Sequence, residues 1–175
     1  IAQMDERVGN QNTLAPGSEQ AFMRPGAQGM TAAPHAILVD QSGVRYMNEG
    51  GSYAAYCKAM LERNKVVPAV PSWMIFDSQY TRKYMLAGTM PSRKKLQRWH
   101  DEGYLKRGDT LAALAAETGI DPRVLAATGA RFNGFVAANR DADFLRGARA
   151  YDRWLGDPTH RPSETLGTIE HGPFY

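Results

Sequence analysis

The chain contains very little cysteine. Cys57 is the single cysteine among 175 residues, so no internal disulfide can form and a zinc site built on several thiolates is not available. A small secreted fold held together by disulfides is thereby excluded. One unpaired thiol fits a reducing compartment, and a cytoplasmic location is expected.

Long apolar runs and clustered charges of one sign are also lacking. The longest apolar stretches, at 66–70 and 111–116, are far shorter than the ~20 residues that a membrane-spanning helix needs. The formal net charge is +3, and the densest basic group lies at 93–98. This group is too small for a nucleic-acid footprint. Neither a membrane span nor a nucleic-acid partner is expected.

Several motifs of cofactor and catalytic chemistry are missing. The sequence has no Gly-x-Gly-x-x-Gly and no Gly-x-x-x-x-Gly-Lys-Ser/Thr, which are the backbone cradles for dinucleotides and nucleoside triphosphates. It has no Gly-x-Ser-x-Gly nucleophile elbow, and its four histidines lie far apart without metal-ligand spacing. We therefore expect no metal site, no serine hydrolase and no cofactor held by this stretch alone.

What is present is typical of one globular core. Hydrophobic residues make up 43% and charged residues 22% of the chain, and a chain of this length buries roughly 68–70% of its unfolded surface. The sequence begins at Ile1 and ends at Tyr175, without a signal segment. We expect it to be one piece of a longer protein.

Periodicity and capping residues predict a mixture of helices and short strands. Residues 1–34 are rich in glycine and proline and are expected to form an extended, looping leading segment. Ser52, Asp109 and Asp121 are expected to cap helices. The expected elements are a hairpin of strands 36–40 and 44–47 around Gly43, a strand at 73–76, and helices at 53–63, 78–84, 96–99, 110–118, 122–139 and 144–150.

One constellation stands out as a candidate for chemistry. The hairpin is expected to deliver Glu49 to a loop, and Tyr53 follows four residues later. From the residues alone, a structural interpretation, with Glu49 as a helix cap and Tyr53 in the core, is favoured over catalysis. Arg45 and Asn48 are expected to fix the hairpin loop through hydrogen bonds. The charged and aromatic run at 141–153 is interpreted as a solvated loop or as a seal against another domain, with the seal preferred.

A resemblance to a known family changes this balance. Residues 37–49, Ile-Leu-Val-Asp-Gln-Ser-Gly-Val-Arg-Tyr-Met-Asn-Glu, closely resemble the signature that opens the substrate-capping domain of fumarate reductase and succinate dehydrogenase-type flavoproteins. Met4-Asp5 resembles the end of the preceding FAD-domain segment. Further landmarks look like the 3-ketosteroid dehydrogenase branch of that superfamily and fall in its order; they lie at 71–77, Tyr84, 119–125, 130–133, 141–147, 151–152, 156–158 and 173–175.

The resemblance implies a fold and a domain organisation. We expect an α+β capping domain with a small, mainly antiparallel sheet and surrounding helices at 36–175, preceded at 1–35 by a segment of the FAD domain. The FAD-binding Rossmann domain is expected to be absent from this chain. FAD is then the cofactor of the parent enzyme and is not bound by this stretch alone. The implied partners are the FAD-binding domain of the same parent chain and a steroid-like or small organic substrate.

The resemblance also implies a reaction and a set of site residues. An FAD-dependent dehydrogenase of this branch introduces a carbon–carbon double bond next to a ketone, and its capping domain supplies a tyrosine base four residues after the signature glutamate. Tyr53 occupies that position, with Glu49, Ser52 and Tyr56 as expected substrate contacts. Because a phenol has a pKa of about 10, the base needs a neighbour that eases deprotonation.

Two departures from the family pattern keep alternatives open. The fumarate reductase branch has an arginine shortly after the glutamate, and residues 50–56 contain none. The ketosteroid branch commonly has a proline before the tyrosine, where Ser52 stands here. The alternatives are a capping domain of a fumarate reductase-like enzyme that acts on small unsaturated acids, and a binding module without redox chemistry.

Overall fold

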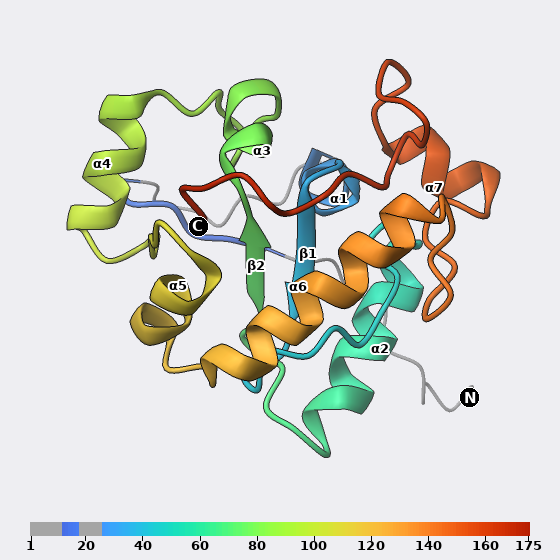
Figure 1. Ribbon diagram of the computed structural model, residues 1–175, viewed down its shortest axis with the longest axis horizontal. Coiled ribbons are helices and arrows are strands. Elements are labelled where there is room, and N and C mark those ends of the chain that lie inside the picture. Colours follow the sequence, from blue (N-terminus) through green and yellow to red (C-terminus); the bar gives the residue numbers. More distant parts are fainter. Residues whose placement is uncertain (1–11, 18–25) are drawn as a thin grey trace, which may run out of the picture.

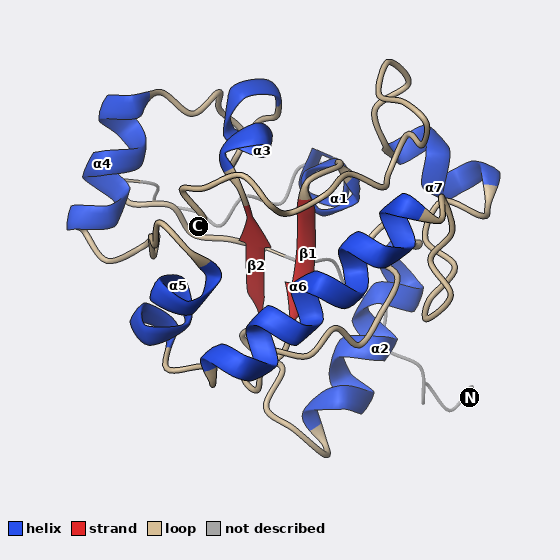
Figure 2. Cartoon of the chain, in the orientation of Figure 1, coloured by secondary structure: helices blue, strands red, loops and turns tan. Residues whose placement is uncertain are grey.

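The structure is a computed structural model that describes residues 12–17 and 26–175 of the chain (Figure 1). The resemblance noted at Met4-Asp5 lies outside the described residues. Within them, helices and loops surround a single two-stranded sheet (Figure 2). The expected α+β class with a small antiparallel sheet is confirmed.

The sheet pairs two strands that are far apart in the sequence. β1 (Ala36–Val39) runs antiparallel to β2 (Trp73–Phe76), with Ile37 opposite Ile75. Both strands are apolar, β1 with two β-branched residues and β2 with two aromatic ones, which suits a sheet that is covered on its two faces.

The prediction that residues 44–47 pair with β1 as a hairpin is wrong. Residues 44–47 form no strand, and Val39 and Arg45 share only an isolated bridge. The reason is that the outer edge of β1 is occupied by a side chain, since the Leu38 amide donates to Glu49 Oε1 at 3.1 Å. The turn itself is confirmed, because Gly43 lies in it with a φ of 86°.

Seven helices are seen among the described residues. Compared with the sequence expectation, one lies in the leading segment that was expected to loop, the 96–99 turn grows into a longer helix, and the last helix begins at Ala150 rather than at 144. They are α1 (Gly26–Ala32), α2 (Tyr53–Asn64), α3 (Ser78–Lys83), α4 (Arg93–Asp101), α5 (Leu111–Thr118), α6 (Pro122–Ala137) and α7 (Ala150–Leu155).

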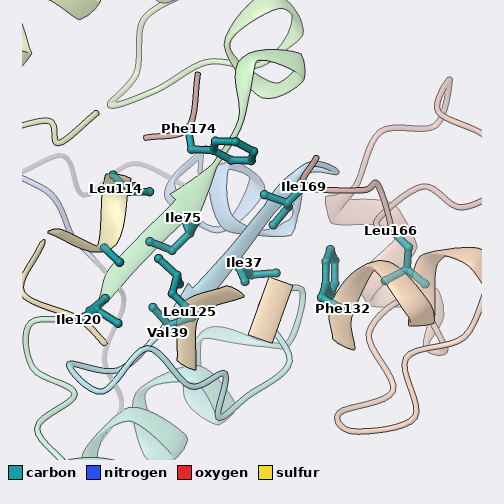
Figure 3. Close-up of a cluster of buried hydrophobic side chains, with 11 residues drawn as sticks. Ile37, Val39, Ile75, Leu114, Ile120, Leu125, Phe132, Leu166, Ile169 and Phe174 are labelled. Atoms are coloured by element: carbon teal, nitrogen blue, oxygen red, sulfur yellow. The ribbon is translucent and has the colours of Figure 1, made fainter. Parts of the chain in front are cut away.

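The main core lies between one face of the sheet and helices α5 and α6. In Figure 1, α6 crosses in front of β1. Ile37, Val39 and Ile75 project from this face, and Phe132 of α6 is fully buried among the side chains that cover it (Figure 3). Burial of each such side chain contributes about 1.5–3 kcal/mol to the free energy of unfolding.

The opposite face of the sheet is covered by the other helices. Leu38 packs with Tyr56 of α2, whereas Ala36 and Phe76 pack in a cluster that includes Tyr80 of α3 and residues of α4. Among the described residues, no helix combines the length and the apolar character that crossing a membrane requires. The sheet is therefore a thin central layer, and the loop that carries Glu49 lies at its β1 edge.

Candidate functional site

The first turn of α2 presents the tyrosine that the sequence singled out. Ser52 caps the helix, because its hydroxyl accepts a hydrogen bond from the Ala55 amide at 3.4 Å. Tyr53 is the first residue of the helix, and 48% of its surface is exposed. At the other end of α2, Arg63 forms an ion pair with Asp40 at 2.7 Å. Both ends of the helix are thus fixed to the loops around β1.

Glu49 lies in the interior and not at the surface. Its side chain has no exposed area, and Arg45 binds both carboxylate oxygens at 2.8 Å, a bidentate arrangement. Arg146 adds a second cation at 3.3 Å, and the Leu38 amide donates to the same carboxylate. Burial alone would raise the pKa of Glu49, but the charges of the two arginines outweigh it and hold the pKa at about 2.

Two more charged groups complete this buried network. Asp141 accepts a hydrogen bond from Arg45 at 2.9 Å. The guanidinium of Arg146 donates to the carbonyls of Ala32, Ala33 and Ala36. It therefore connects the end of α1 to the start of β1, while its charge is shared with Glu49. We call Arg45, Glu49, Asp141 and Arg146 the ion-pair cluster.

The loop between the ion-pair cluster and α2 is fixed as well. The side-chain amide of Asn48 makes two hydrogen bonds. Its Nδ2 donates to Asp152 Oδ2 at 2.9 Å, and its Oδ1 accepts from the backbone amide of Gly50 at 2.9 Å. Asp152 is fully buried. The backbone that leads to Tyr53 is therefore held on both sides, which is what a precisely placed functional side chain requires.

Both interpretations of the run at 141–153 are wrong for its key members. Asp141, Arg146 and Asp152 are each at most 2% exposed, so they form neither a solvated loop nor a surface seal. Their side chains point inward because each is paired with a partner inside the fold. The partners are Arg45, Glu49 and Asn48, about a hundred residues earlier in the sequence. No local pattern in the sequence signals such long-range pairs.

The four expected site residues do not converge on one exposed spot. The expectation that Glu49 contacts substrate does not fit its geometry, since its carboxylate is saturated and has no exposed surface. Ser52 uses its hydroxyl in the helix cap. Tyr56 is 2% exposed, and burial raises its pKa well above the ordinary range, so it stays protonated. Among these four, Tyr53 is the most exposed residue.

A cavity of about 560 Å³ lies beside the sheet. Tyr56, Leu38 and Met60 line one part of it, and Trp73 and Met74 of β2 line another. Its lining is mostly apolar. Tyr53 and Glu49 are not among its lining residues, so the cavity and the exposed phenol are separate features.

Neither strand of the described part forms a phosphate cradle of the usual kind. β1 is followed by the turn at 40–43, and β2 is followed by Asp77, which caps α3. A glycine-rich turn between strand and helix is the common way to hold the pyrophosphate of FAD.

The fold and the site define a small α+β domain that presents a tyrosine from the first turn of a helix, directly after a loop held by buried ion pairs. The chain belongs to the FAD binding domain family, whose model matches residues 11–175.

Two named proteins are similar to this chain in sequence. A 3-oxosteroid 1-dehydrogenase of Mycolicibacterium smegmatis is 40% identical over 148 residues, which is 82% of this chain and 26% of that protein. A 4-oxocyclohex-2-ene-1-carboxylate 5-dehydrogenase of Sinomonas cyclohexanicum is 31% identical over 98% of this chain and 30% of that protein. The chain thus spans less than a third of the length of either relative.

A solved structure is also similar. The crystal structure of 3-ketosteroid delta1-dehydrogenase from Sterolibacterium denitrificans, in complex with 1,4-androstadiene-3,17-dione, has a TM-score of 0.84 and 27% sequence identity. The match covers 98% of this chain and 30% of that one. The fold of this chain therefore also occurs within a solved 3-ketosteroid dehydrogenase.

The family match corrects one expectation. From the sequence, the FAD-binding domain was expected to lie wholly outside this chain. The FAD binding domain model instead matches residues 11–175 of the chain. The expectation was wrong because it equated that domain with the strand, glycine-rich turn and helix that carry the cofactor's phosphates. The family's domain also includes an α+β stretch of the present kind, and a search for glycine motifs does not detect it.

Proposed function

We propose that residues 36–175 form the substrate-capping domain of an FAD-dependent dehydrogenase that acts on cyclic ketones, with 3-ketosteroids as the first substrate class to test. Residues 1–35 lead into it from the rest of the flavoprotein. The observation that carries the proposal is the placement of Tyr53, which is half exposed at the start of a helix whose preceding loop is anchored by the ion-pair cluster. The similarity to 3-oxosteroid 1-dehydrogenases supports it.

Tyr53 is the proposed general base. Oxidation of a ketone to its α,β-unsaturated product removes a hydride from one carbon and a proton from the neighbouring carbon, and the bound flavin supplies the hydride acceptor. The phenolate of Tyr53 would take the proton, so that the C–H bond breaks and an O–H bond forms. A rigid backbone around Tyr53 keeps the hydroxyl at one distance from the reacting carbon, as general-base catalysis requires.

The roles of the other predicted site residues change with this proposal. Glu49 acts as a positioning residue that holds the loop before Tyr53, and Ser52 positions the first turn of α2. Tyr56 lies beneath the helix and supports it from the core. A reductase of small unsaturated acids is less well supported, because residues 50–56 offer no arginine for proton delivery. A cytoplasmic location belongs to the same proposal and is supported by the single free thiol of Cys57.

The proposal is tested by replacing the phenol hydroxyl in the whole flavoprotein. Tyr53→Phe is expected to slow single-turnover flavin reduction by a 3-ketosteroid about 10²–10⁴-fold, since this is the usual loss when a general base is removed. The Kd for the substrate and the melting temperature should change little, because the ring is kept. The same flavin-reduction assay with 4-oxocyclohexanecarboxylate compares a small cyclic ketone with the 3-ketosteroid as substrate.

Tyr151→Phe is the matched control. Tyr151 is also a partly exposed tyrosine in the first turn of a helix, α7. Its replacement should leave the reduction rate close to that of the wild type. A near-normal rate in the Tyr53→Phe protein would remove Tyr53 from the mechanism and leave it as a surface residue.

A further inference from the structure

The outer edge of β2 already carries the beginning of a third strand. The Phe76 amide donates to the Tyr175 carbonyl at 3.0 Å, and the Tyr175 amide donates to the Phe76 carbonyl at 2.8 Å. Two residues that exchange both backbone hydrogen bonds form the closely spaced pair of an antiparallel ladder. The two rings also stack, with centroids 5.6 Å apart and planes 18° apart. Tyr175 therefore sits in strand register with Phe76.

The next ladder position along this edge is open. Backbone groups alternate in direction along a strand, and in β2 those of Trp73 and Ile75 face Val39 and Ile37 of β1. The amide and carbonyl of Met74 therefore point outward, as those of Phe76 do. Within residues 12–17 and 26–175, no backbone hydrogen bond is made to Met74 on this side. An open sheet edge is a template for another strand.

Space for a strand lies next to this edge. The cavity of about 560 Å³ is lined on the β2 side by Ser72 and Met74, and also by Leu105, Leu114 and Tyr175. Leu105 and Leu114 are buried residues of the two large apolar clusters. The cavity therefore adjoins both Tyr175 and the unpaired part of β2, and its lining is mostly apolar.

We propose that this edge is the docking site of the polypeptide that follows Tyr175 in the whole flavoprotein, which adds there as a third, antiparallel strand. The inference rests on the proposed function, in which this chain is one domain of a longer protein, and the relatives are more than three times its length. The pair of Phe76 and Tyr175 sets the register. The second residue after Tyr175 pairs with Met74, and the fourth pairs with Ser72.

The register also predicts which kind of side chain each position of the added strand should carry. The second residue after Tyr175 shares the face of Met74 and Leu38, and the first shares the face of Ile75. Because both faces belong to apolar clusters, both positions should be apolar. This main-chain addition would tie β2 to the rest of the flavoprotein and fix the orientation of the domain that presents Tyr53.

A disulfide in the whole flavoprotein tests the register. In a Cys57→Ser background, Met74→Cys is combined with a cysteine at the second residue after Tyr175. Directly opposed residues have Cα atoms about 5.5 Å apart, within the range that a disulfide bridges. Mild oxidation should give an intramolecular bond. The matched control places the cysteine at the first residue after Tyr175, whose side chain leaves on the other face, and should give little bond.

Amide exchange in the unmodified protein is independent of these variants. The Met74 amide is expected to exchange at least about tenfold more slowly than the amide of Arg107, which is exposed and donates no hydrogen bond within the described residues. Fast exchange at Met74, equal bonding in both cysteine variants, or a disulfide between two molecules would each overturn the proposal. Pairing without turnover of ring ketones would instead overturn the proposed function and leave this inference in place.

Discussion

The carboxylate of Glu49 is shared by two arginines and a backbone amide that come from three separate parts of the chain. A buried charge of this kind is stable only while its partners are present, because an uncompensated ion in the interior loses its hydration without replacement. At the scale of the residue, Glu49 is therefore an anchor of the loop before Tyr53.

Glu49→Gln is expected to lower the free energy of unfolding by about 3–5 kcal/mol, the usual loss when one member of a buried ion pair is removed. The variant leaves Arg45 and Arg146 in the interior without their main counter-ion. Denaturant unfolding followed by circular dichroism measures the change. Asp143→Asn, which breaks the exposed pair with Arg131, is the control and should barely shift the midpoint. A similarly small shift for Glu49→Gln would show that the ion-pair cluster does not stabilise the fold.

Gly43 is the second residue whose role the structure defines sharply. Its φ is +86°, and a Cβ placed on it would lie 2.5 Å from Cγ2 of Ile120. Gly43→Ala should therefore cost more than about 2 kcal/mol, from left-handed backbone strain and a steric clash together.

Gly103→Ala is the matched control for that prediction. Gly103 has a φ of +76° but no neighbour within 4 Å of the added Cβ. It should lose only the strain, about 1–2 kcal/mol. Thermal unfolding of both variants compares them, and equal losses would mean that Ile120 moves aside without cost.

At the scale of the element, helix α5 is capped by a different residue than the sequence predicts. Asp109 is expected from the sequence to cap this helix, yet the hydroxyl of Thr110 accepts from the Ala113 amide at 3.1 Å. Both residue types favour the cap position, so composition alone cannot choose between neighbours. The side chain of Asp109 is largely exposed, which makes the structural cap one residue later than expected.

Two alanine variants test this one-residue difference. Thr110→Ala should destabilise the protein by about 1 kcal/mol, the typical loss of a helix cap. Asp109→Ala should have a clearly smaller effect. Urea unfolding of the two proteins under identical conditions gives the comparison, and a larger loss for Asp109→Ala would return the cap to the position that the sequence favours.

At the scale of the whole molecule, the ion-pair cluster links global stability to pH. The pKa of Glu49 is about 2 in the folded protein, whereas an unfolded glutamate titrates near pH 4.3. A carboxyl whose folded pKa is depressed stabilises the fold above the unfolded pKa, and this stabilisation is lost as the pH falls through the folded pKa. We therefore expect full stability above about pH 5 and a steady loss between pH 5 and 2.

Unfolding titrations across that range measure the effect. Asp40 and Asp157, whose pKa values are also lowered, contribute to the same loss. Glu49→Gln should flatten the slope of stability against pH, because it removes one titrating group of the folded state. An unchanged slope in that variant would mean that Glu49 does not carry the acid sensitivity.

Elements with strong local signals could be predicted from the sequence alone. Ala36–Val39 and Trp73–Phe76 are apolar runs bounded by turn residues, and Asp121-Pro122 is a cap followed by a proline suited to the first helical turn. Each of these elements was predicted correctly, because its signal lies within a few residues. Tyr53 was singled out from the sequence through its spacing from Glu49 in a family signature, and its catalytic role stays a prediction.

The strand that pairs with β1 and the role of Glu49 could not be predicted from local signals and are seen in the folded chain. Residues 44–47 do not add to β1 because the outer amide of Leu38 donates to Glu49, and Glu49 is buried against Arg146, which lies about a hundred residues later in the sequence. Strand pairing and ion pairing depend on where distant segments meet, and their energies are set by burial. Local periodicity carries no information about contacts between distant segments. The pairing of β1 with β2 and the burial of Glu49 could therefore not be derived from the sequence.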